Sequence, residues 1–202
     1  MKILRYKSKS EEPAIIKLIA GSLRKGGVVV LPTDTIYGLS CLADDSRAIE
    51  RIYSLKRRAV RKPLIILVSS LAMLKKYVFL SKEQTDRLKK IWEPGRRPTT
   101  VIFRHRHLLA PELTAFSDSL AARLPKSELL IKIVKASRKP LVSTSLNLSG
   151  EENIHDLARL SEIFPDSTKR PDLVLDTGPS RRRKASRLID LRSADKPVIL
   201  RR

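Results

Sequence analysis

The chain has 202 residues, of which 42% are hydrophobic, and this is enough for one domain with a substantial buried core. Its 42 lysines and arginines against 21 aspartates and glutamates give a formal net charge of +21. Such an excess attracts polyanions, with nucleic acid the favoured partner and a merely solvated basic surface the alternative. The single cysteine, Cys41, excludes a disulfide framework and a cysteine-based zinc cluster.

The chain carries no recognisable targeting or membrane segment. Residues 1–12 lack the apolar stretch of a signal peptide. No apolar run approaches the roughly 20 residues that cross a bilayer. We therefore expect a soluble, cytoplasmic protein without a membrane partner.

Helices and strands are predicted in alternation along the chain. A helix begins at Ser10 and ends at Gly26–Gly27, and the continuous apolar run that follows predicts a strand covered on both faces. The absence of a Gly/Ser linker between elements predicts one α/β domain over residues 1–202, with a mixed sheet. The further predicted elements are helices at 46–56, 70–77, 82–92, 127–137 and 155–163, and strands at 28–32, 64–68, 99–103, 119–124, 140–144, 173–176, 187–191 and 197–201.

Common catalytic and cofactor motifs are absent from the sequence. There is no P-loop, GxGxxG, GxSxG or HExxH, which argues against a Rossmann cofactor, an α/β-hydrolase and a zincin. The three histidines are too few and too poorly spaced with carboxylates to predict a metal site.

Four polar segments lie at the ends of predicted strands, where open α/β sheets bind ligands. They are residues 32–38, 56–63, 122–125 and 143–150. The arginines and lysines of 56–63 match phosphate oxygens, and the hydroxyls of 143–150 suit a polar ligand. Taken singly, each also has a structural explanation, such as a turn, a basic helix end or a Ser/Asn cap.

Together, the ordered segments resemble the YrdC-like family of threonylcarbamoyl-AMP synthases. They are "GGVVVLPTDTIYGL", "KRR" followed by "KPLIILV", "IWEPG" then "PTTVIF", "ARLP" and "PLVSTSLNLSG". The resemblance runs from about Gly26 to the end and implies the short, single-domain form, with a mixed twisted sheet around a basic concave cavity. It also implies a nucleotidyltransferase, L-threonylcarbamoyladenylate synthase, which condenses L-threonine, bicarbonate and ATP to threonylcarbamoyl-AMP and pyrophosphate. The Mg²⁺ would arrive with ATP, and a partner enzyme would then form N6-threonylcarbamoyladenosine in tRNA.

The resemblance assigns binding residues by motif position. No catalytic residue or metal ligand is assigned, because positioning and charge neutralisation supply most of the rate in such phosphoryl chemistry. Asp34 is a candidate helper, with a turn residue as the alternative. The threonine-binding residues are Thr35, Arg123, Ser145 and Ser186, and the ATP-binding residues are Lys56, Arg58, Lys62, Ser119, Ser143, Asn147 and Arg201.

The sequence departs from the family pattern at four places, mainly on the ATP side. Leu67 stands where some members have histidine, and "PGRRPTT" (94–100) carries two inserted arginines. "SRL" at 186–188 replaces Ser-Thr-Val, and "NIH" at 153–155 replaces Ser-Pro-Thr. The element "STSLNLSG" is also similar to YciO-like paralogs.

The alternative function is therefore RNA binding on the same fold. The ligand would be tRNA or rRNA, including double-stranded RNA, because few aromatic residues are available for base stacking. The predicted phosphate contacts come from Arg181, Arg182, Arg183 and Lys184, together with Arg96, Arg97, Arg104 and Arg106.

Overall fold

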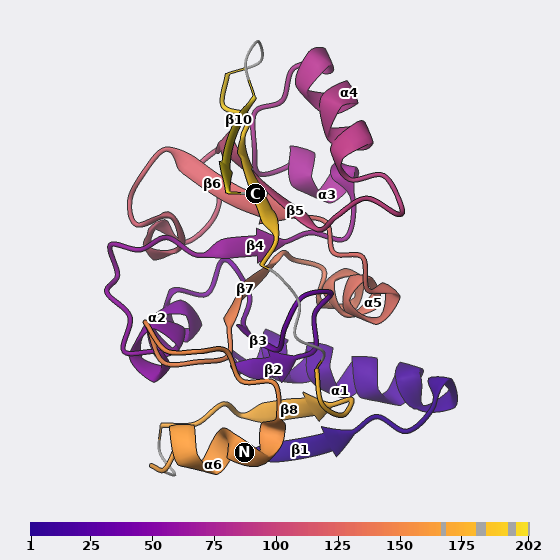
Figure 1. Cartoon of the computed structure of the whole chain (residues 1–202), viewed down its shortest axis with the longest axis vertical. Coiled ribbons are helices and arrows are strands. Elements are labelled where there is room, and N and C mark those ends of the chain that lie inside the picture. The colour runs from indigo at the N-terminus through magenta and orange to yellow at the C-terminus, as the bar shows by residue number, and fades with distance from the viewer. Residues whose placement is uncertain (167–168, 181–184, 194–196, 202) are drawn as a thin grey trace.

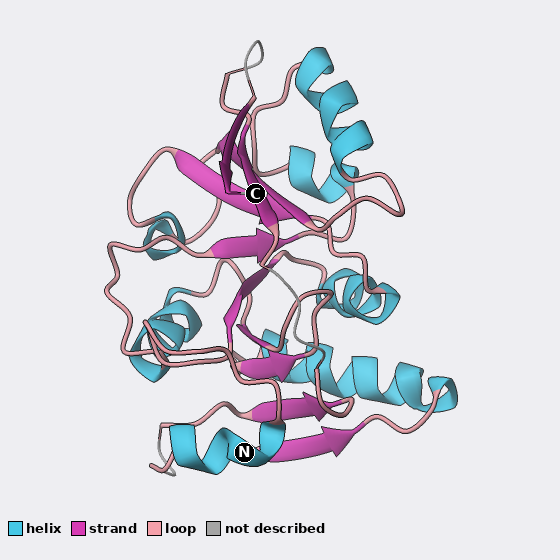
Figure 2. Cartoon of the chain, in the orientation of Figure 1, coloured by secondary structure: helices cyan, strands magenta, loops and turns pink. Residues whose placement is uncertain are grey.

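The computed structural model describes residues 1–166, 169–180, 185–193 and 197–201. The described strands form one ten-stranded sheet in the order β1-β8-β2-β3-β7-β4-β6-β5-β9-β10 (Figures 1 and 2). The strands are β1 (Lys2–Arg5), β2 (Val29–Leu31), β3 (Gly38–Ser40), β4 (Ile65–Leu67), β5 (Thr99–Arg104), β6 (Ser119–Arg123), β7 (Leu141–Ser145), β8 (Leu173–Asp176), β9 (Arg187–Asp190) and β10 (Val198–Arg201).

The sheet is mixed, which confirms the predicted α/β class. Strand pairs β1/β8, β2/β8, β4/β6 and β5/β9 are parallel. Pairs β2/β3, β3/β7, β4/β7, β5/β6 and β9/β10 are antiparallel. The helices are α1 (Glu12–Arg24), α2 (Ser46–Leu55), α3 (Leu71–Lys75), α4 (Lys82–Ile91), α5 (Glu128–Ser137) and α6 (Leu160–Ile163), with single 3₁₀ turns at Lys9–Glu11, Pro111–Thr114 and Leu157–Arg159.

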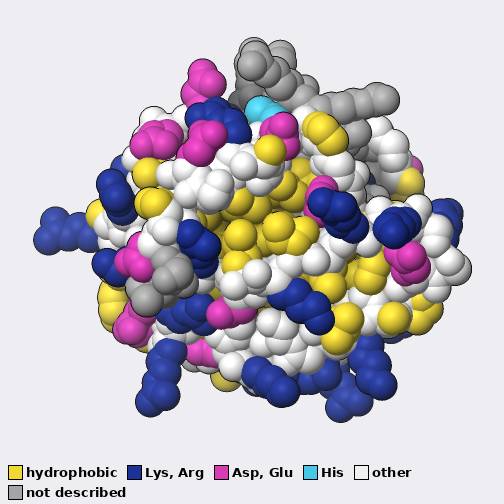
Figure 3. Space-filling model, turned by 90° about the horizontal axis from the view of Figure 1, so that it is seen from below, with side chains coloured by type: hydrophobic (Ala, Val, Ile, Leu, Met, Phe, Trp, Pro, Cys, Tyr) yellow, Lys and Arg dark blue, Asp and Glu magenta, His cyan; other side chains and the backbone are white. Residues whose placement is uncertain are grey.

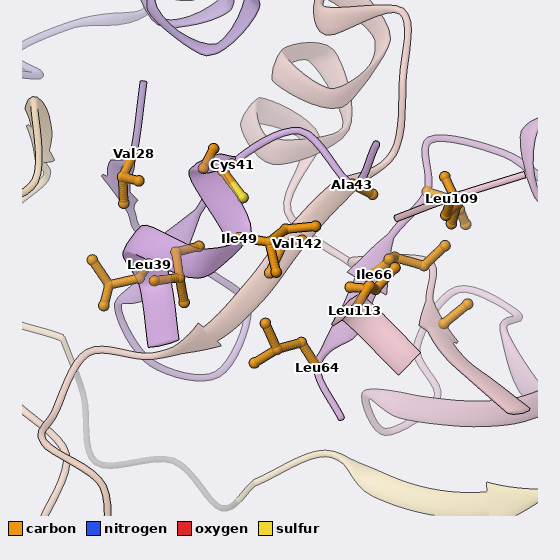
Figure 4. Close-up of a cluster of buried hydrophobic side chains, with 14 of the residues drawn as sticks. Val28, Leu39, Cys41, Ala43, Ile49, Leu64, Ile66, Leu109, Leu113 and Val142 are labelled. Atoms are coloured by element: carbon orange, nitrogen blue, oxygen red, sulfur yellow. The ribbon is translucent and has the colours of Figure 1, made fainter. Parts of the chain in front are cut away.

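Two hydrophobic cores cover opposite faces of the sheet. In β2, Val29 and Leu31 pack in the core beneath α1 and α5, whereas Val30 packs in the core that contains α2. Figure 4 shows part of this second core, with Ile49 of α2 beside Val142 of β7. β4 divides in the same way, with Ile66 in the α2 core and Leu67 in the other. Successive side chains of a strand point to opposite faces, so a strand covered on both faces reads as a continuous apolar run.

Sequence reasoning missed two strands and overestimated one helix. β1 is an edge strand with two basic residues among its four, and β3 has only three residues, the first of which ends the polar segment 32–38. The helix predicted at 155–163 is a 3₁₀ turn followed by the short α6. Ser81 and Gln84 form a capping box at the start of α4.

Candidate ligand-binding site

A cavity of about 230 Å³ opens beside the ends of β3, β4, β6 and β7. It lies where two halves of the sheet meet, one formed by β1-β8-β2-β3-β7 and the other by β4-β6-β5-β9-β10. Arginines, serines and threonines make up nine of its seventeen lining residues, next to a substantial apolar part. The polar lining residues are Thr33, Thr35, Tyr37, Arg58, Arg123, Ser143, Thr144, Ser145, Asn153, Ser186 and Arg201, and the others are Ile36, Gly38, Pro63, Leu64, Ile65 and Ala185.

The loop at 32–38 is held in shape by its own side chains. The hydroxyl of Thr33 accepts hydrogen bonds from the backbone N–H of Thr35 at 3.1 Å and of Ile36 at 3.2 Å. Tyr37 is buried, and its hydroxyl donates to the carbonyl of Gly178 at 2.6 Å. The polar residues after the buried strand therefore build a fixed turn, from which Thr35 reaches the cavity.

Arg123 is the buried cation of the site. Its side chain is 4% exposed at the end of β6, and its terminal nitrogen lies 3.3 Å from Oδ1 of Asp34. Among the described residues, its Nε has no hydrogen-bond partner. Burial lowers the pKa of Arg123, with nearby Arg201 adding to the effect and Asp34 opposing it. Because arginine stays charged in proteins, a carboxylate or phosphate in the cavity is the natural partner for this guanidinium.

Arg201 and Arg58 bring two more positive charges to the lining. Arg201 of β10 donates from Nε to the carbonyl of Ser186 at 3.0 Å. The hydroxyl of Ser186 is also 2.9 Å from that of Thr100 in β5. Arg58 is folded back onto its own loop, where its NH2 donates to the carbonyl of Pro63 at 3.0 Å. The lining is thus electropositive on several sides.

Lys56 and Asn147 lie behind the lining and do not reach it. Nζ of Lys56 donates to Oδ1 of Asn147 at 2.7 Å and to the carbonyls of Asn147 at 2.9 Å and Ser145 at 2.5 Å. The hydroxyl of Ser145 donates to the same Oδ1 at 2.6 Å. Burial, aided by Arg58, lowers the pKa of Lys56 to about 7. In this geometry Lys56 and Asn147 orient Ser145 toward the cavity.

The structure brings together most, but not all, of the residues predicted for the site. The four residues predicted for threonine all line the cavity, as do Arg58, Ser143 and Arg201 of the ATP set. Lys62 is exposed outside the lining, and Ser119 lies at the far end of β6, hydrogen-bonded to Ser117. Of the residues predicted to bind RNA, 181–184 lie outside the described residues.

Leu67 and Asp34, two positions singled out in the sequence, lie outside the lining of the cavity. Leu67 is fully buried in the core with α1 and α5, so it does not line the cavity, and Ile65 lines it instead. Asp34 is paired with Arg123, and its Oδ2 accepts the backbone N–H of Lys126 at 3.2 Å. This carboxylate braces the site and is absent from the lining.

Sequence reasoning leaves several lining residues unassigned. Thr33, Tyr37 and Gly38 belong to the segment 32–38, but the motif assigns only Thr35 there. Strand alternation could have identified Ile65, because it is two residues from Leu67 on β4 and points to the same face. Asn153 begins the "NIH" segment, which the sequence marks only as a departure from Ser-Pro-Thr, so no role was assigned to it.

The part of the chain that the structure describes offers neither a cluster of metal ligands nor a membrane-spanning helix. Within the described ranges, no three His, Cys, Asp or Glu side chains are grouped to hold a metal ion. No described helix has the length and apolar character needed to cross a membrane.

The fold and the cavity together define an α/β protein whose site suits an anionic small molecule. Residues 21–202 match the sequence model of the Sua5/YciO/YrdC family, which carries the description "Telomere recombination". The chain therefore belongs to the Sua5/YciO/YrdC family, in agreement with the resemblance found in its sequence.

Two curated relatives are both named threonylcarbamoyl-AMP synthase. The protein from Pyrococcus abyssi is 31% identical over 186 residues, covering 92% of this chain and 53% of the relative. The protein from Klebsiella pneumoniae is 36% identical over 148 residues, covering 72% of this chain and 76% of the relative. This chain thus spans about half the length of the Pyrococcus protein.

Solved structures agree with this assignment. Pyrococcus abyssi Sua5, solved in complex with L-threonine, superposes with a TM-score of 0.83 at 30% identity over 99% of this chain and 56% of that protein. Escherichia coli YciO superposes with a TM-score of 0.80 at 28% identity, covering 99% of this chain and 93% of YciO. The mixed α/β fold is therefore shared with both branches of the family.

Proposed function

We propose that this protein is an L-threonylcarbamoyladenylate synthase, a nucleotidyltransferase that acts on L-threonine, bicarbonate and ATP. The single observation that supports this most is the buried guanidinium of Arg123, which lines the cavity with Nε free of any described partner. A fixed cation of this kind suits the carboxylate of an amino acid. Two relatives bear the name of this enzyme, and one relative's structure holds L-threonine.

In the proposed binding mode, each part of the lining serves one part of the substrates. Arg123 pairs with the threonine carboxylate, while the hydroxyls of Thr35 and Ser145 contact its amine and side chain. Arg58 and Arg201 neutralise the phosphates of ATP. Mg²⁺ would arrive coordinated mainly by those phosphates and by water, since Mg²⁺ retains much of its hydration, and the hydroxyl oxygens of the lining are compatible donors.

The proposed reaction proceeds in two steps, and neither step requires a side chain of the protein as a catalytic base. The neutral threonine amine forms a new C–N bond with carbon dioxide released from bicarbonate, and its proton combines with the hydroxide lost from bicarbonate to give water and a carbamate. An oxygen of the carbamate then attacks the α-phosphorus, and the bond to the pyrophosphate oxygen breaks. Positioning and neutralisation of charge on the phosphates supply the rate enhancement, which accounts for a lining rich in cations and hydroxyls.

The test is to incubate the purified protein with ATP, Mg²⁺, bicarbonate and L-threonine while omitting one substrate at a time. We expect pyrophosphate and threonylcarbamoyl-AMP to appear together and only when all three substrates are present. Pyrophosphate release that is independent of threonine, or no product from folded protein, would contradict the proposal.

RNA binding is a second candidate, favoured by the net charge of +21. A tRNA is the fitting partner, because the product of the proposed reaction is destined for tRNA through a partner enzyme. On the face shown in Figure 3, lysine and arginine side chains are spread around the periphery, with hydrophobic side chains near the centre. Lysine and arginine side chains would bind RNA through its phosphates, without reading of bases.

A further inference from the structure

The two arginines inserted into the segment 94–100 lie in different environments. Arg96 is on the outer side of the loop, where its Nε is 3.4 Å from a carboxylate oxygen of Glu93 and its side chain is 67% exposed. Arg97 instead donates from its NH2 to the carbonyl of Ala185 at 3.3 Å. Ala185 lines the cavity, so the guanidinium of Arg97 lies at its rim.

The backbone around Arg97 is joined firmly to this part of the cavity wall. The N–H of Arg187 donates to the carbonyl of Pro98 at 2.9 Å, which fixes the loop beside the start of β9. Thr100, three residues after Arg97, bonds the hydroxyl of Ser186 at 2.9 Å. These bonds fix the backbone that follows Arg97 beside residues 186 and 187, and so keep Arg97 close to Ala185.

The contact that Arg97 makes is weak enough to exchange. Its described hydrogen bonding uses one N–H, to a neutral carbonyl, although a guanidinium carries five N–H donors. A charged, bidentate contact to phosphate oxygens is stronger than a single bond to a neutral carbonyl in an exposed position. The lining beside it already contains Arg58, Arg123 and Arg201, and no carboxylate among the described residues.

We propose that Arg97 is an additional phosphate-binding residue of this site. When a nucleotide enters the cavity, the guanidinium leaves the carbonyl of Ala185 and binds phosphate oxygens at the rim. This inference depends on the proposed function in one respect, which is that the ligand of the cavity is a nucleoside triphosphate. It gives the two-arginine insertion a role that strengthens the ATP side of the site.

The experiment is to measure the binding of ATP and of adenosine to the full chain by calorimetry. We expect Arg97→Ala to weaken ATP binding about tenfold, because one charged hydrogen-bonding contact is removed, and to leave adenosine binding within about twofold. Arg96→Ala is the matched control, because it removes the same charge from the neighbouring position, and it should change ATP binding less than about twofold. Arg97→Lys should restore part of the affinity, since it keeps the charge but not the planar fork.

Three outcomes would overturn the inference. Equal weakening of ATP and adenosine binding in Arg97→Ala would mean that Arg97 only supports the wall. Equal weakening in Arg97→Ala and Arg96→Ala would reduce the effect to general surface charge. Absence of ATP binding by the parent protein would remove the ligand itself. In contrast, ATP binding that depends on Arg97 without formation of threonylcarbamoyl-AMP would contradict the proposed reaction and leave this inference standing.

Discussion

Asp34 and Arg123 form a buried ion pair across the wall of the cavity, with 3.3 Å between Oδ1 and the guanidinium nitrogen and both side chains 4% exposed. Asp34 comes from the loop after β2, and Arg123 ends β6 on the other half of the sheet. The pair therefore connects the two halves at the site. It also holds Arg123 in place while leaving its Nε without a described partner.

Asp34→Asn should destabilise the fold by about 3 kcal/mol, because it leaves the buried guanidinium without its counter-charge. The free energy of unfolding from urea titrations measures this directly. Asp118→Asn is the control, since Asp118 is 93% exposed and should change stability by less than about 0.5 kcal/mol. A destabilisation by Asp34→Asn no larger than the control's would show that the pair does not brace the fold.

Arg123→Lys should separate ligand binding from stability. The lysine keeps a charge for Asp34 but lacks the rigid fork of N–H donors, so we expect threonine binding to weaken about tenfold or more. Calorimetric titration with L-threonine gives the affinity, and urea unfolding gives the stability. Unchanged threonine affinity in a folded variant would remove Arg123 from the carboxylate contact.

The sequence predicted most strands correctly but not the buried position of Lys56, and the difference has a physical reason. Strands such as β4 were recognised because burial on both faces leaves a continuous apolar run, a property of each strand alone. The sequence predicts that Lys56 binds phosphate, together with the other cations of segment 56–63. Lys56 is buried because carbonyls and an amide from residues 145 and 147, about ninety positions away, surround its ammonium. Such long-range partners leave no pattern in the local sequence.

The contribution of Lys56 to stability should depend on pH. Its pKa is about 7 in the folded protein and near 10.5 in an unfolded chain, so between these values the unfolded state binds more protons. Stability should therefore rise with pH from about 7 upward, and below pH 7 this group should add no pH dependence because it is protonated in both states. The free energy of unfolding of the parent minus that of Lys56→Met should increase by roughly 2 kcal/mol between about pH 7 and pH 9.

The subtraction matters because most other titrating groups are common to both proteins and cancel. A difference that stays flat over this range would show that the acceptor oxygens around Nζ keep the lysine charged in the folded state. A difference that falls as pH rises would mean that folding raises its pKa.

A side chain at Gly38 should crowd the neighbouring strand, because β3 and β7 approach closely beside the cavity. A Cβ at this position would lie 3.0 Å from the carbonyl oxygen of Thr144 and 3.2 Å from Oγ of Ser143. We expect Gly38→Ala to cost about 1 to 3 kcal/mol and to weaken threonine binding, since Ser143 and Thr144 line the site.

Gly21→Ala is the matched control for Gly38→Ala. Gly21 lies inside α1, and a Cβ there meets nothing within 4 Å. Alanine at this position should stabilise the protein by about 0.5 to 1 kcal/mol, because glycine loses more conformational freedom in a helix. Thermal unfolding of both variants should shift the midpoint in opposite directions, and shifts of equal sign would contradict the steric argument.

RNA binding and the synthase reaction should be separable by substitution. Replacing Arg181, Arg182, Arg183 and Lys184 together by glutamine should weaken RNA binding and flatten its dependence on salt, by about 0.9 in the slope of log K against log salt for each duplex phosphate that is no longer neutralised. Arg123→Ala should abolish formation of threonylcarbamoyl-AMP and leave the RNA affinity nearly unchanged, because its side chain is buried. Filter binding of tRNA over a range of salt concentrations, with product formation measured on the same preparations, gives both readouts. Equal reduction of both activities in each variant would mean that one surface serves both ligands, and a flat salt dependence in the parent would contradict binding through phosphates.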